Sequence, residues 1–70
     1  MIINNAEDFG IALRERRKKL GYTQAFLSEF SGLSVSFISD LERGKTTAEL
    51  GKSLFLANLL GMDLSLSWRE

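Results

Sequence analysis

Seventy residues make a single domain over residues 1–70, and a chain this short buries only about 60% of the surface that its unfolded form exposes, which favours help from a second subunit. The sequence has no Cys and no His, so it lacks disulfides, thiolate ligands and the commonest metal ligand and general base; we expect no metal, no cofactor and no enzymatic activity. Nine Lys and Arg balance nine Asp and Glu, which argues against a nonspecific coat on nucleic acid.

The first two predicted helices cover the basic end of the chain and the segment after it. One spans about residues 7–20 and ends at Gly21. Its last turns carry five of the nine cations, which are Arg14, Arg16, Arg17, Lys18 and Lys19. The next helix, about 23–31, begins at Thr23, whose hydroxyl can cap the free amides, and ends at Gly32. The apolar side chains expected to face the core are Phe9, Leu13, Leu20, Leu27 and Phe30.

Two more helices complete the predicted domain. The third spans about 34–43, with Ser34 as its cap. The fourth spans about 47–60, because Thr46 and Glu49 have the spacing of a capping box. Apolar side chains cover more of this fourth helix than one small core requires, so a second buried face is expected.

After the fourth helix the hydrophobic period changes from that of a helix to that of a strand. Large apolar residues alternate with polar ones, which predicts a strand over about 62–68. Its backbone needs a partner, and we expect the same strand of a second subunit across a two-fold axis. Pairing with Ile2-Ile3 of the same chain is the alternative. The residues expected in the dimer interface are Phe55, Leu56, Leu59, Met62, Leu64, Leu66 and Trp68.

The stretch from Thr23 to Gly44 carries the predicted function. Two short helices joined by a tight, Gly-containing turn form the helix-turn-helix unit, whose first helix crosses the DNA backbone and whose second lies in the major groove. The sequence therefore predicts a protein that binds double-stranded DNA.

Several residues in this stretch resemble those of the Cro and phage-repressor (XRE) family. They are Arg17, Thr23-Gln24, Leu27, Gly32, Ser34, Ile38 and the run from Leu41 to Lys45, and the resemblance covers about residues 9–60. It implies an all-α, four-helix, lambda-repressor-like domain with a short C-terminal β-strand that pairs across a dimer. Within the family the chain looks most like the HipB type, an antitoxin that represses its own operon together with a HipA-like kinase toxin.

The resemblance also implies roles for single residues. The positions of base-reading residues are held by Ser34, Val35, Ser36 and Ser39, whose small side chains give modest readout, so specificity should depend on DNA shape and on dimer spacing. The residues that contact phosphates in the family stand at the positions of Thr23, Gln24, Arg43 and Lys45. For the Ser residues and Gln24 the alternative is a solvated polar face.

Arg17 lies in the basic run, but its register turns it inward, and the resemblance pairs it with Glu42 as a structural ion pair.

Two residues depart from the family pattern. Phe26 is either a partner contact or a cover over Tyr22, and Asp40 stands on the DNA-facing side, where phosphates repel it unless it accepts a hydrogen bond from a cytosine amino group.

The predicted function is that of a sequence-specific repressor, as a homodimer on a palindromic operator, and the resemblance implies a HipB-like antitoxin that represses its own toxin–antitoxin operon. The alternatives are a free-standing XRE-type regulator and a protein-interaction module that binds no DNA. The longest apolar stretch, Leu54 to Leu60, is far too short to span a bilayer, and no secretory leader is apparent, so we expect a cytoplasmic protein with no membrane contact.

Overall fold

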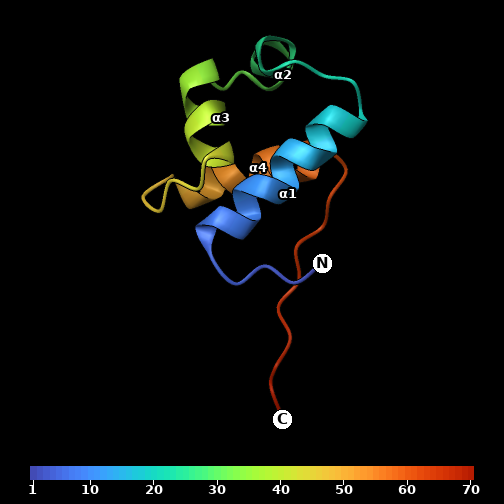
Figure 1. The fold of residues 1–70 in the computed structure, drawn as a ribbon, viewed down its shortest axis with the longest axis vertical. Coiled ribbons are helices and arrows are strands. Elements are labelled where there is room, and N and C mark those ends of the chain that lie inside the picture. Colours follow the sequence, from blue (N-terminus) through green and yellow to red (C-terminus); the bar gives the residue numbers. More distant parts are fainter.

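The computed structural model describes all of residues 1–70 and contains four helices (Figure 1). They are α1 (Ala6–Lys19), α2 (Gln24–Ser31), α3 (Val35–Glu42) and α4 (Leu50–Leu59). The expected all-α fold is confirmed. The four helices gather at one end of the molecule, and the C-terminal segment extends away from them (Figure 1). None of the helices has the length and the apolar character that crossing a bilayer demands.

Side-chain caps decide where α2 and α3 begin. The Thr23 hydroxyl accepts a hydrogen bond from the Phe26 amide, and the Ser34 hydroxyl accepts one from the Phe37 amide, each at 3.0 Å. Both satisfy an amide that the first turn of a helix leaves without a partner. The two residues thus act as the expected caps, with the helical backbone starting one residue later.

The start of α4 differs from the prediction. The prediction of a capping box between Thr46 and Glu49, with a helix from residue 47, is wrong. Helix α4 begins at Leu50, and Glu49 is its cap. The Glu49 carboxylate accepts hydrogen bonds from the amides of Gly51 (2.9 Å) and Lys52 (2.7 Å). A carboxylate satisfies two amides at once and its charge suits the helix N-terminus, so it competes well with one hydroxyl. The bonds from the amides of Lys52 and Gly51 lower the pKa of Glu49.

The core is small and apolar, and the burial of two residues differs from the prediction. Phe30, expected to point inward, is 57% exposed, because α2 is only eight residues long and Leu27 is its buried position. Leu56, expected at the dimer interface, is 1% exposed, so it already fills the core of its own chain. The fully enclosed apolar residues are Leu13, Leu27, Ile38, Leu41, Leu56, Ala57 and Leu60.

The C-terminal segment forms no strand within the chain. Met62 still packs against the core, and its amide donates to the Ala57 carbonyl at 3.0 Å. Beyond it the backbone makes no ladder with Ile2-Ile3, so the alternative of intrachain pairing is not what the structure shows. Trp68 is 96% exposed. Strand pairing with a second subunit therefore stays a prediction.

Candidate nucleic-acid interface

The turn between α2 and α3 is held by three local hydrogen bonds. Gly32 has φ +79, a left-handed conformation that favours glycine, and its amide donates to the Ser28 carbonyl at 2.9 Å. The Ser28 hydroxyl donates to the Leu33 carbonyl at 2.6 Å, and the Leu33 amide donates to the Ser31 hydroxyl at 3.1 Å. Because these bonds lie within the turn, the angle between the two helices is set locally.

The solvent side of α3 carries the four residues that were expected to read bases. Ser34, Val35 and Ser36 are exposed and Ser39 is half-buried. The opposite side of α3 is anchored in the core. The Ser34 hydroxyl accepts from the Phe37 amide, which leaves its proton free to donate to a ligand.

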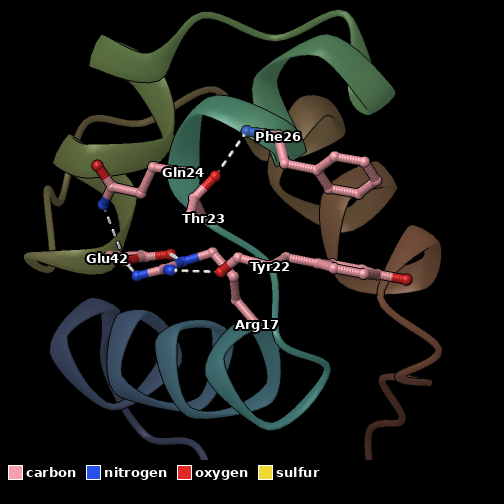
Figure 2. A network of polar contacts seen from close by, with 6 residues as sticks. All are labelled: Arg17, Tyr22, Thr23, Gln24, Phe26 and Glu42. Carbon is pink, nitrogen blue, oxygen red and sulfur yellow. Dashed lines mark hydrogen bonds and ion pairs between the residues drawn. The ribbon is translucent and has the colours of Figure 1, made fainter.

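A network of polar side chains joins α1, α2 and α3 (Figure 2). Arg17 Nε donates to Glu42 Oε2 at 2.7 Å, and Arg17 Nη2 donates to Glu42 Oε1 at 3.0 Å. Arg17 Nη1 donates to the Tyr22 carbonyl at 2.8 Å. The two charged side chains are only 9% and 3% exposed. The hydrogen bond to the Glu42 side chain, together with the charge of that side chain, raises the pKa of Arg17, so the guanidinium stays charged at neutral pH.

Gln24 belongs to the same network, which the sequence did not indicate. Its Nε2 donates to Glu42 Oε1 at 3.0 Å, and Figure 2 shows its amide turned toward Glu42 and away from Phe26. Glu42 therefore joins α1, the N-terminus of α2 and the last turn of α3. Gln24 keeps a second N–H and its carbonyl oxygen for a ligand. No local signal links two residues 18 positions apart.

Gly10 has a role in helix packing that the sequence pattern does not indicate. It is buried in the middle of α1, where a Cβ atom would lie 2.6 Å from the Glu42 carbonyl oxygen and would collide with that of Leu41. The missing side chain lets α1 approach the backbone of α3. A glycine inside a helical pattern costs about 1 kcal/mol relative to Ala, and that cost was the available signal.

Asp40, unexplained by the sequence, forms ion pairs with two neighbouring cations. One oxygen lies 2.7 Å from Arg43 Nη2, and the other lies 3.5 Å from Lys45 Nζ. These are the two cations expected to contact phosphates beyond the end of α3. The Asp40 side chain is 35% exposed, so the cluster borders the solvent side of α3.

Phe26 is explained in part. Its ring lies 4.9 Å from that of Tyr22 and 5.9 Å from that of Phe30, between ring centroids. Phe26 therefore covers Tyr22, one of the two alternatives, but stays 48% exposed itself.

One cation at the basic end of α1 already has a partner within the chain. Arg16 Nε donates to the Leu60 carbonyl at the end of α4, at 2.8 Å.

The model of the helix-turn-helix family matches residues 13–67 of this chain. The chain belongs to the XRE-type helix-turn-helix family. This family consists of DNA-binding transcriptional regulators. An uncharacterized HTH-type transcriptional regulator of Sinorhizobium fredii is 36% identical over 64 residues, which cover 91% of this chain and 84% of that relative. The resemblance to the XRE family is thus confirmed.

A solved structure shows that the fold is shared as well. A chain in the complex of a HipB variant with the O2 20mer superimposes with a TM-score of 0.88, at 21% identity. The match covers 100% of this chain and 97% of that one. The likeness therefore extends over the whole helix-turn-helix domain, including the segment after α4.

Proposed function

We propose that this helix-turn-helix regulator is a dimeric repressor that binds a palindromic operator. The observation that carries the proposal is the surface of α3, where Ser34, Val35 and Ser36 face solvent beside a turn held by its own hydrogen bonds. An α-helix with such a surface fits the major groove. The proposed base-reading residues are Ser34, Val35, Ser36 and Ser39.

Phosphate contacts would hold α3 in register on the duplex. Thr23 and Gln24 lie at the N-terminus of α2, where free amides and the helix dipole favour an anion. The hydrogen bond from Gln24 to Glu42 fixes one end of its amide, so the other end is oriented before DNA arrives. Arg43 and Lys45 would contact phosphates at the other end of the helix-turn-helix unit, beyond α3.

Footprinting on the DNA upstream of the gene tests this proposal. The expected result is two protected half-sites whose centres lie about 34 Å apart, one helical turn, or a multiple of that distance. A dimer imposes this spacing because its two recognition helices are related by a two-fold axis. Protection of one unrepeated half-site, or no binding even at low salt, would contradict the proposal.

The proposed dimer uses α4 and the C-terminal segment. Phe55 on α4 is 48% exposed, and Leu66 and Trp68 have almost no contact with the rest of their own chain. Large apolar side chains stabilise a structure by roughly 1.5–3 kcal/mol each when they become buried. A two-stranded ribbon between subunits, laid over Phe55 and Leu59, would bury both sets and satisfy the backbone of the segment.

Removing residues 64–70 is expected to convert the dimer to a monomer, as measured by sedimentation equilibrium. This truncation keeps Met62, which packs on the core, so the helical domain retains its own contacts. The matched control removes only residues 69–70, beyond the apolar pattern, and should remain dimeric. If the longer truncation sediments as the same dimer as the intact chain, the segment is not the dimer interface.

The finer proposal is that the regulator is an antitoxin of the HipB type, which represses an operon shared with a HipA-like kinase toxin. The XRE resemblance and a fold that covers nearly all of the HipB chain support it. The test is co-expression with the product of the neighbouring gene. A kinase that copurifies with this protein supports the antitoxin role, and a neighbour that is no kinase and does not bind favours a free-standing regulator.

A further inference from the structure

Asp40 holds a central position in a charged cluster at the end of α3. Each carboxylate oxygen faces one cation, Arg43 Nη2 at 2.7 Å and Lys45 Nζ at 3.5 Å. The backbone fixes the same arrangement, because the Asp40 carbonyl accepts hydrogen bonds from the amides of Arg43 (3.2 Å) and Lys45 (3.1 Å). The three side chains are therefore held together by the turn that ends the helix.

The location of this cluster opposes DNA binding. A carboxylate at the C-terminal end of a helix is unfavourable for the helix dipole, and close to phosphates it is repelled. It also neutralises one of the two cations that nonspecific DNA binding would use. The ion pairs themselves are weak, because the Arg43 and Lys45 side chains are 72% and 51% exposed, so they add little to the stability of the fold.

We propose that Asp40 is a specificity-determining residue, which keeps Arg43 and Lys45 from binding phosphates on DNA of arbitrary sequence. Nonspecific binding rests almost entirely on contacts between cations and phosphates, so a carboxylate that competes for the cations weakens it most. Operator binding has base contacts in addition and loses a smaller share of its free energy. Specificity then comes from a side chain that weakens binding to DNA other than the operator. The inference rests on the proposed DNA binding.

The experiment measures the affinity of Asp40→Asn for a random-sequence duplex of about 20 bp and for the duplex that the footprint identifies, over a series of salt concentrations. We expect affinity for the random duplex to rise about two- to tenfold at low salt, and the salt slope to steepen by about 0.9. Affinity for the operator should rise less. The matched control is Glu15→Gln, which changes the net charge equally at an exposed residue of α1 that is in none of the ion pairs. It should cause a smaller change in both quantities.

A second set of variants assigns the effect to the cations. In a background with Arg43→Gln and Lys45→Gln, Asp40→Asn should raise affinity for the random duplex much less, because only the direct repulsion between the carboxylate and the phosphates is then removed. Thermal melting checks that each variant folds, and Asp40→Ser replaces Asp40→Asn if that variant does not. Unchanged affinity for the random duplex, or an equal rise on both duplexes, would overturn the role of Asp40. A wild-type protein that binds neither duplex at low salt would instead contradict the proposed function.

Discussion

Replacing Glu42 with Ala is expected to lower the free energy of unfolding by about 3–5 kcal/mol. The substitution removes two of the three acceptors of the Arg17 guanidinium and its only charged partner, while the guanidinium stays charged and only 9% exposed. A buried charge without a partner costs far more than the intact pair contributes. Gln24 loses its partner too, but the Gln24 side chain is only half-buried, so that loss is smaller. Denaturant unfolding followed by circular dichroism measures the change.

A double variant separates the effect of the charge from that of the space that the two side chains occupy. Exchanging both partners for apolar residues, Arg17→Met with Glu42→Leu, should lose much less stability than Glu42→Ala, because no unpaired charge is left behind. DNA affinity per folded molecule should change less than stability in the Glu42→Ala variant. An unchanged melting curve together with lost DNA binding would make Arg17 a DNA contact rather than a structural residue.

Replacing Gly10 with Ala is expected to destabilise the protein by about 3 kcal/mol, the upper end of the range for overpacking. The new Cβ would lie 2.6 Å from the Glu42 carbonyl oxygen, and backbone atoms can move away only if α1 separates from α3. Helix propensity alone predicts the opposite sign, a gain of about 1 kcal/mol. The sign of the change in thermal unfolding therefore tests the close contact directly.

The matched control is Gly51→Ala, the other glycine within a helix. There the added Cβ would meet only the flexible end of the Glu49 side chain, at 3.0 Å, so the change should stay within about 1 kcal/mol. Because Gly10 contacts the last turn of α3, its substitution should also weaken DNA binding of the fraction that remains folded. A stabilising Gly10→Ala would show that α1 and α3 are less closely packed in solution.

Local signals in the sequence determined the number of helices, the caps at Thr23 and Ser34, and the glycine turn between α2 and α3. Each of these depends on residues within one turn of one another, so the chemistry of a short segment is sufficient. The same locality explains why the solvent side of α3 could be identified, since Ile38 and Leu41 establish the direction of its buried face.

The tertiary structure decided the features that depend on how elements cross. Hydrophobic period alone does not say which side of an apolar helix a neighbour covers, and so Leu56 lies in the core while Phe30 remains outside. The meeting of Gln24 with Glu42, and of Gly10 with the end of α3, requires three helices to be in place at once. Such contacts join residues far apart in the chain, and they are selected by packing at a few ångströms, which no pattern within a single segment encodes.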